Sequence, residues 1–205
     1  MNEQLGRQTY RLERPPVAVS WANIGGRQEE AGPLSPYFDE LDQDSFFGEK
    51  TWEKAESAMQ KLALGKALEK ATLPPEELDY IFAGDLLNQC IGTSFGLRDF
   101  GVPFYGLYGA CSTMGESLAL ASLTIAGGFA RRAGAMTSSH FCTAERQYRM
   151  PVPYGNQRTP TAQWTATASG CVILGTEGEG PKITAVPCGK IVDKGIKDAN
   201  NMGAA

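Results

Sequence analysis

The feature that most restricts the fold of this chain is the alternation of short apolar runs with helical patterns. The apolar positions of 51–71 recur every three or four residues, which predicts an amphipathic helix that Pro74 and Pro75 end. A second helix, rich in small residues, is predicted from about 113 to 129. Apolar runs typical of buried strands lie at 17–22, 78–83, 102–108, 131–139 and 165–174. This order indicates an α/β domain whose mixed, mostly parallel sheet is covered by helices on both faces.

The ends of the chain frame this domain. Residues 1–16 are polar and charged and are interpreted as an N-terminal tail. The α/β domain is expected to span 17–186, and 187–205 would be a connection beyond it. The runs at 182–186 and 190–192 are expected to close the visible sheet.

Composition and charge exclude several classes of protein. A net charge of −4 and a pI near 5.1 argue against a nucleic-acid-binding surface, which needs a concentrated positive face. No apolar stretch approaches the roughly 20 residues that cross a bilayer, and residues 1–16 hold no secretory signal. The five cysteines are odd in number, widely spaced and without a C-x-x-C pair, so free thiols are predicted, and no metal site.

The stretch 105–118 is the strongest candidate for chemistry. A predicted strand ends in glycine, turns through Gly109 and Ala110, and places Cys111 at the start of the small-residue helix. The free N–H groups and the positive dipole end of a helix favour a thiolate, an oxyanion or a ligand carboxylate. A buried structural cysteine is an equally good interpretation of Cys111 taken alone.

Several stretches together carry a family resemblance. They are Gly109–Thr113, Gly32–Leu34, Thr51–Glu56, Gly84–Gln89, Ser138–Arg149, Pro160–Thr167 and Val192–Asp198. The chain resembles the N-terminal half of the thiolase and ketoacyl-synthase fold. More narrowly, from about Pro15 onwards, it resembles the stage V sporulation protein AD (SpoVAD) family of spore-forming Firmicutes.

The resemblance implies a function in ligand transport. Members of this family are understood to be the soluble component of the SpoVA machinery, which moves dipicolinic acid, as its calcium chelate, into the forespore and releases it in germination. The implied partners are dipicolinic acid or its calcium chelate and the SpoVA membrane proteins at the spore inner membrane. A homodimer is also allowed, and no cofactor or nucleic acid is implied. The residues expected to bind the ligand are Cys111, Ser112, Thr113, Asn88, His140 and Gln163.

Some of these residues also have purely structural interpretations. Asn88 follows a predicted strand end, where a capping role is as good as a ligand contact. Gln163 could donate to a ligand or fill the polar face of a strand. His140, the single histidine, is more often a hydrogen-bonded structural residue in such a setting, with pocket lining as the alternative.

Acyl transfer by a thiolase-like or ketoacyl-synthase-like enzyme is the alternative function. It would use Cys111 as nucleophile and coenzyme A as the acyl carrier, with a histidine and a second histidine or an asparagine to move protons. His140 does not match a catalytic histidine of that fold, in which these residues come from the second half. Because the fold has two similar halves, 187–205 is expected to lead into a C-terminal half, without which apolar surface would be exposed.

Overall fold

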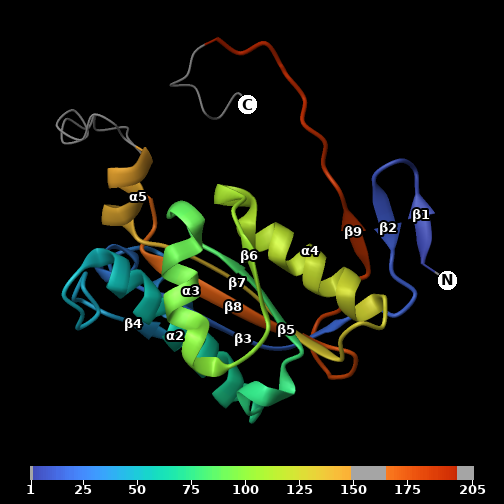
Figure 1. The fold of residues 1–205 in the computed structure, drawn as a ribbon, viewed down its shortest axis with the longest axis horizontal. Coiled ribbons are helices and arrows are strands. Elements are labelled where there is room, and N and C mark those ends of the chain that lie inside the picture. Colours follow the sequence, from blue (N-terminus) through green and yellow to red (C-terminus); the bar gives the residue numbers. More distant parts are fainter. Residues whose placement is uncertain (1, 149–164, 198–205) are drawn as a thin grey trace.

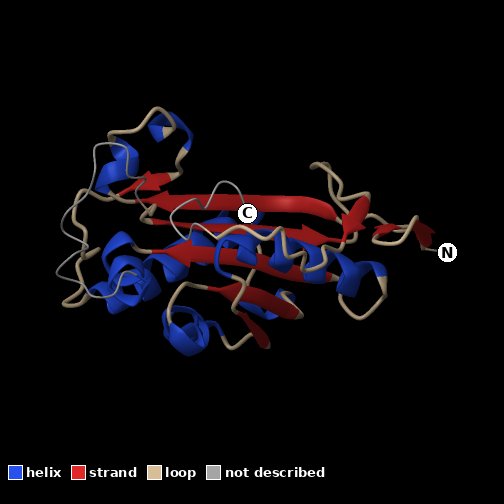
Figure 2. Ribbon diagram, turned by 90° about the horizontal axis from the view of Figure 1, so that it is seen from above, coloured by secondary structure: helices blue, strands red, loops and turns tan. Residues whose placement is uncertain are grey.

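The main feature of the fold is a six-stranded mixed sheet. The computed structural model describes residues 2–148 and 165–197. The strand order is β4-β3-β8-β7-β5-β6, and the strands run side by side along the molecule (Figure 2). Their bounds are β3 (Val17–Gly25), β4 (Glu40–Leu41), β5 (Tyr80–Gly84), β6 (Phe104–Leu107), β7 (Arg132–Ser139) and β8 (Ala168–Gly175). The pairs β3–β4, β5–β6 and β5–β7 are parallel, whereas β8 is antiparallel to β3 and β7, so the predicted mixed, mostly parallel sheet is confirmed.

Helices cover both faces of this sheet. α2 (Trp52–Ala71) and α3 (Ile91–Leu97) lie on one face, and α4 (Thr113–Ala126) lies on the other (Figure 1). Successive residues of a strand point to opposite faces, so Ile81 packs in the core under α2 while Phe82 packs under α4. The short helices α1 (Arg27–Glu30) and α5 (Phe141–Tyr148) follow β3 and β7. Within the described ranges, no helix is long and apolar enough to cross a membrane.

The first long helix forms as its sequence predicts. The backbone N–H of Lys54 donates to the Thr51 hydroxyl, 3.3 Å away, which caps the first turn of α2. The helix ends where Thr72 takes a left-handed conformation (φ 54°), two residues before Pro74. α4 ends at Ala126, earlier than the predicted 129, because Gly127 and the left-handed Gly128 (φ +81°) follow.

The two ends of the described chain meet in a second, small sheet. Residues 3–11 form the hairpin β1 (Glu3–Leu5) and β2 (Thr9–Arg11), which the sequence reading did not predict. β9 (Ala185–Pro187) pairs with β2, and this sheet lies at one end of the molecule (Figure 1). The prediction that 182–186 and 190–192 close the main sheet was therefore wrong: the strand pairing between these runs and the main sheet is limited to an isolated bridge of Lys182 to Val17, and Ile183 packs against its α4 side.

Candidate functional site

A tight turn connects β6 to α4. The 3₁₀ turn η5 (Ala110–Ser112) lies between them, and Ala110 has a left-handed backbone (φ +48°). The Ser112 hydroxyl donates to the Gly109 carbonyl at 2.7 Å, and the Thr113 hydroxyl donates to the Ala110 carbonyl at 2.8 Å. Both predicted ligand-binding hydroxyls thus hold the turn itself, and Thr113 is buried.

A glycine allows this turn to approach the neighbouring strand. A Cβ atom on Gly84, at the end of β5, would lie 2.0 Å from the Leu107 carbonyl oxygen and 2.8 Å from the Thr113 side chain. Only a residue without a side chain lets β6 and the start of α4 pass so close to β5.

Cys111 is exposed at this turn and opens into a cavity of about 650 Å³. The cavity lies where β3 and β7 end and β8 begins. Its lining residues are Asn23, Phe38, Leu86, Ala110, Cys111, Met114, Thr137, Ser138, Ser139, Thr165, Ala166, Ala168, Ser169 and Gly170. Parallel strands whose carboxyl ends meet a helix N-terminus are the usual place for a ligand site in α/β folds.

The described lining residues carry no charged side chain. Three hydroxyls on the lining already donate to protein carbonyls: Thr137 to Gly84 at 3.2 Å, Ser139 to Ala166 at 2.5 Å, and Ser169 to Thr137 at 3.2 Å. Their oxygens keep lone pairs, so the cavity offers oxygen acceptors, a thiol and the N-terminus of α4.

Asn88 does not line this cavity. It is exposed in the turn after β5, and the Tyr108 hydroxyl lies 3.5 Å from its side-chain oxygen. Gln163 lies outside the described residues, so its predicted role stays a prediction.

His140 is buried and belongs to a different hollow, of about 480 Å³, beside Arg27 and Cys142. Its Nδ1 accepts from the Cys142 backbone N–H at 3.2 Å, so Nε2 carries the proton and donates to the Ser45 carbonyl at 2.7 Å. Burial lowers the pKa of His140 below its usual 6.5, which keeps the ring neutral. This is the hydrogen-bonded structural arrangement that was one of the two interpretations of the residue.

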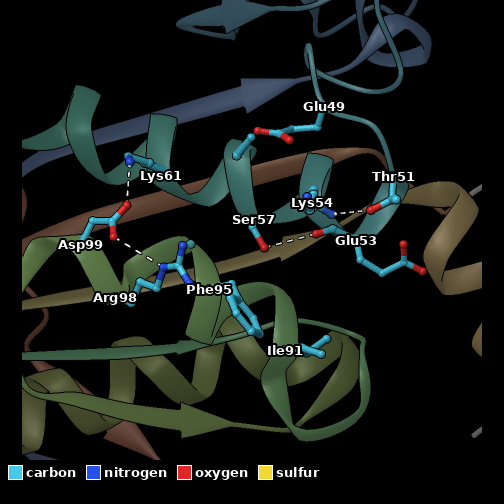
Figure 3. A pocket seen from close by; sticks show the side chains of 12 residues that line it. Glu49, Thr51, Glu53, Lys54, Ser57, Lys61, Ile91, Phe95, Arg98 and Asp99 are labelled. Carbon is cyan, nitrogen blue, oxygen red and sulfur yellow. Dashed lines mark hydrogen bonds and ion pairs between the residues drawn. The ribbon is translucent and has the colours of Figure 1, made fainter.

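A further hollow, of about 500 Å³, lies between α2 and α3 (Figure 3). Ile91 and Phe95 project from α3 beside it, and Asp99 pairs with both Lys61 and Arg98. Because these charges are satisfied by one another on the protein surface, they do not single out a ligand.

The five cysteines are all free thiols, as predicted. Cys171 is buried in β8, and burial raises its pKa to about 12. Burial also raises the pKa of Cys90, whose thiol donates to the Leu107 carbonyl at 3.1 Å. Of the two exposed cysteines, Cys111 and Cys188, Cys111 lines the cavity.

Sequence reasoning missed most of the cavity lining. Asn23, Thr137 and Ser169 come from three strands whose neighbours in space are distant in sequence. A usable signal was the run of small and hydroxyl residues at the end of one predicted strand and the start of another, because such residues leave room for a ligand.

The arrangement of the main sheet and its helices is a thiolase-like fold. A 3-oxoacyl-[acyl-carrier-protein] synthase III from Aquifex aeolicus superposes with a TM-score of 0.51 at 16% identity, over 78% of this chain and 53% of that chain. A tetronic acid condensing enzyme, AbyA1, gives a TM-score of 0.55 at 19% identity, over 82% of this chain and 56% of that chain. Likeness at this identity establishes the fold alone.

The particular family is established by sequence. The model of the stage V sporulation protein AD family matches residues 6–205. The Stage V sporulation protein AD of Bacillus subtilis is 41% identical over 200 residues, which are 98% of this chain and 59% of that protein. The chain therefore belongs to the stage V sporulation protein AD family of sporulation proteins. It spans about three fifths of the length of that relative.

Proposed function

We propose that the Cys111 cavity binds dipicolinic acid, or its calcium chelate, for the SpoVA machinery that takes dipicolinate into the forespore and releases it in germination. The protein would act at the spore inner membrane through the SpoVA membrane proteins. The observation that carries the proposal is a cavity of about 650 Å³ that opens at the start of α4 and is lined by hydroxyls. Its volume lies within the usual range for small-molecule sites, about 300–1,000 Å³.

The charge of the lining favours the chelate over the free dianion. Desolvating two carboxylates without a cation is costly, and the described lining supplies only the partial positive charge of the α4 N-terminus. In the calcium chelate the metal neutralises both carboxylates before binding. Hydroxyl oxygens with free lone pairs, such as those of Thr137 and Ser139, suit the remaining coordination positions of a hard cation.

Thermal melting of the full chain tests this proposal. A ligand that binds the folded state raises the melting temperature in proportion to the logarithm of its concentration over Kd. We expect dipicolinate to raise it, and equimolar calcium and dipicolinate to raise it more than either alone. Absence of any shift at millimolar ligand would count against the proposal.

Two cysteine variants locate the effect. Cys111→Ala should reduce the ligand-induced shift, because the thiol lines the cavity. Cys188→Ala is the matched control, because this cysteine is also exposed but lies beyond β9. The ligand should raise the melting temperature of this variant as much as that of the natural chain.

Acyl transfer is the second candidate, and the exposure of Cys111 at the start of a 14-residue helix favours it. In this function an acyl-CoA would leave its acyl group on the thiol and release coenzyme A. Intact-mass measurement after incubation with an acyl-CoA would then show an adduct that Cys111→Ala abolishes. An unmodified mass would leave the binding function as the better account.

A further inference from the structure

A second hollow lies at the opposite ends of the strands that form the Cys111 cavity. It has a volume of about 580 Å³ and is found where β3 and β7 begin and where β8 and α4 end. This is the end of the molecule that carries the hairpin β1–β2 (Figure 1). The length of the main sheet separates the two hollows, so a ligand at one does not depend on a ligand at the other.

Positive charge is concentrated at this hollow. Arg14, Arg131 and Lys182 line it, against the single carboxylate of Glu177. The chain as a whole carries a net charge of −4, so this local excess of cations does not follow from its composition. The C-terminal end of α4, which borders the hollow, carries only about half an elementary negative charge and cannot balance it. A hollow lined by an excess of one charge attracts ligands of the opposite charge.

Two of these cations are not used in ion pairs. Within the described part of the chain, Arg131 and Lys182 have no ion-pair partner, whereas Arg132, the next residue along, is ion-paired. The adjacent carboxylate of Glu13 partly offsets the charge of Arg14. Arg131 and Lys182 are both exposed, so their charged groups are accessible to an anion from solution.

Hydrogen bonds fix the backbone on which these two cations stand. The Thr176 backbone N–H donates to the Arg131 carbonyl at 3.0 Å, and the Arg131 backbone N–H donates to the Asp79 carboxylate at 2.6 Å. Lys182 forms an isolated antiparallel bridge to Val17, at the start of β3. Strand ends that are distant in sequence are thus held together, which places their cations around one hollow.

A glycine allows the segment before Lys182 to pass close to β3. A Cβ atom on Gly180 would lie 1.9 Å from the Ala18 carbonyl oxygen, so only a residue without a side chain fits there. The Ala18 backbone N–H then donates to the Pro181 carbonyl at 2.8 Å. The position of Lys182 beside the start of β3 is therefore determined by close packing and by hydrogen bonds.

Apolar side chains line the same hollow. Val17, Ile125 and Ala130 are among the lining residues. An inorganic anion has no carbon groups to place against them, whereas an organic phosphate can contact cations and apolar side chains together. The volume lies within the usual range for small-molecule sites, about 300–1,000 Å³. The planar guanidinium group of arginine also matches the geometry of phosphate oxygens.

We propose that this hollow binds an organic phosphate, with the phosphate group at Arg131 and Lys182 and the carbon groups against the apolar lining. The ligand is either a soluble phosphate ester or the glycerophosphate headgroup of an anionic lipid, since the two share this chemistry. Glycerol 3-phosphate is the soluble probe, and calorimetric titration of the full chain at low salt measures its binding. The affinity should fall as salt is added, because these charges are exposed.

Charge-removing variants locate the site. Arg131→Gln and Lys182→Gln should each weaken binding by about three- to tenfold, because each removes one charged contact to the phosphate. Arg7→Gln is the matched control, because Arg7 is exposed at the same end of the molecule, in the β1–β2 turn, and does not line the hollow. Equal weakening by Arg7→Gln would show only long-range attraction and would contradict a site at this hollow.

A second pair of variants tests the sign of the effect. Glu177→Gln removes the one carboxylate of the lining and should strengthen binding. Glu179→Gln removes an equally exposed carboxylate two residues further on, outside the lining, and should leave the affinity nearly unchanged. Equal affinities for the two variants would place the phosphate elsewhere. The melting temperature without ligand checks that each variant is folded.

Vesicles distinguish the two sources of the phosphate. Cosedimentation compares vesicles of phosphatidylglycerol and phosphatidylcholine with vesicles of phosphatidylcholine alone. Binding that requires phosphatidylglycerol and is weakened by Arg131→Gln and Lys182→Gln would assign the site to a lipid headgroup. Binding of glycerol 3-phosphate with the same dependence on these variants, and no binding to vesicles, would assign it to a soluble ester. If the chain binds neither glycerol 3-phosphate at millimolar concentration nor the anionic vesicles, the proposal is wrong.

Discussion

The polar groups on the two sides of the main sheet are organised in opposite ways. On the α2 side, Glu56 and Asp85 are buried and receive hydrogen bonds from neighbouring side chains and backbone. On the α4 side, Cys111 is exposed and opens into a cavity whose described lining carries no charge. The buried carboxylates of the first region have protein partners, although the nearby Gln60 Oε1 is buried with no partner among the described residues, whereas the second region leaves room for a ligand. Stability should therefore depend on the first region, and binding on the second.

The largest expected loss of stability comes from Asp85→Ala. The change leaves two backbone N–H groups and one hydroxyl without their acceptor, which should reduce the free energy of unfolding by about 3–5 kcal/mol. Asp99→Ala is the control, because its ion pair with Lys61 is exposed to solvent and screened by it, so a much smaller loss is expected. Denaturant unfolding measures both losses, and equal losses would remove the distinction between the buried Asp85 carboxylate and the surface ion pair.

Glu56→Gln should have the next largest effect, and its size should depend on pH. The pKa of Glu56 is raised to about 7 in the folded protein from 4.5, so between these values the folded state holds a proton that the unfolded state has lost. As the pH rises through this window, the free energy of unfolding falls by about 1.4 kcal/mol per pH unit, about 3 kcal/mol in total. Above about pH 7, Glu56 causes no further change in stability with pH.

The variant lacks this dependence because its amide is neutral in both states. Glu56→Gln should therefore match the natural chain near pH 4.5 and exceed it in stability above pH 7. Denaturant unfolding at pH 5, 6, 7 and 8 measures the difference in stability between the variant and the natural chain. Glu69→Gln, at an exposed position of α2, is the control. A difference that is the same at all four values would mean that Glu56 does not change its protonation on folding.

A pair of glycine substitutions compares the close approach of β5 to the Cys111 turn with an open position in α4, the helix that follows this turn. Gly84→Ala forces Cβ against the Leu107 carbonyl and should cost about 2–3 kcal/mol. Gly115→Ala, in α4, meets nothing within 4 Å and should gain about 0.5–1 kcal/mol from higher helix propensity. Thermal melting separates the two, and a neutral Gly84→Ala would show that the turn can move away from β5.

The position of Cys111 could be predicted from sequence because all of its determinants are local. A strand, a glycine turn and a helix of small residues follow one another between 104 and 126. Five strands of the main sheet were also predictable, since they are apolar runs, whereas β4 (Glu40–Leu41) was not, because it has only two residues and lies in a polar stretch. The hairpin β1–β2 and its pairing with β9 were not, because strands of three residues carry little pattern and this pairing joins opposite ends of the chain.

The buried polar residues of α2 were missed because polar residues on a helix are expected to face solvent. Glu56 and Gln60 nevertheless share a face of α2 with Ala63 and Ala67, at intervals of four, three and four residues. Two polar residues in register with a stripe of buried alanines are a signal that could have been used. Their partners, Asp85 and Ser138, could not have been assigned, because strand pairing across the fold brings them there.

The smallest change that compares the two sides is alkylation of single thiols, which leaves the fold in place. Iodoacetamide should modify Cys111 and Cys188 in the folded chain, because both are exposed. Cys171 should stay unmodified until the protein unfolds. Its thiol is fully buried, so the reagent cannot reach it, and burial raises its pKa to about 12, so almost none of it is the reactive thiolate. Peptide mass spectrometry in buffer and in denaturant gives the rates.

A ligand in the Cys111 cavity should slow modification of Cys111 and leave the rate at Cys188 unchanged, because a ligand covers only the thiol that lines its site. Equal slowing of both would place the ligand elsewhere or indicate a general effect on the reagent.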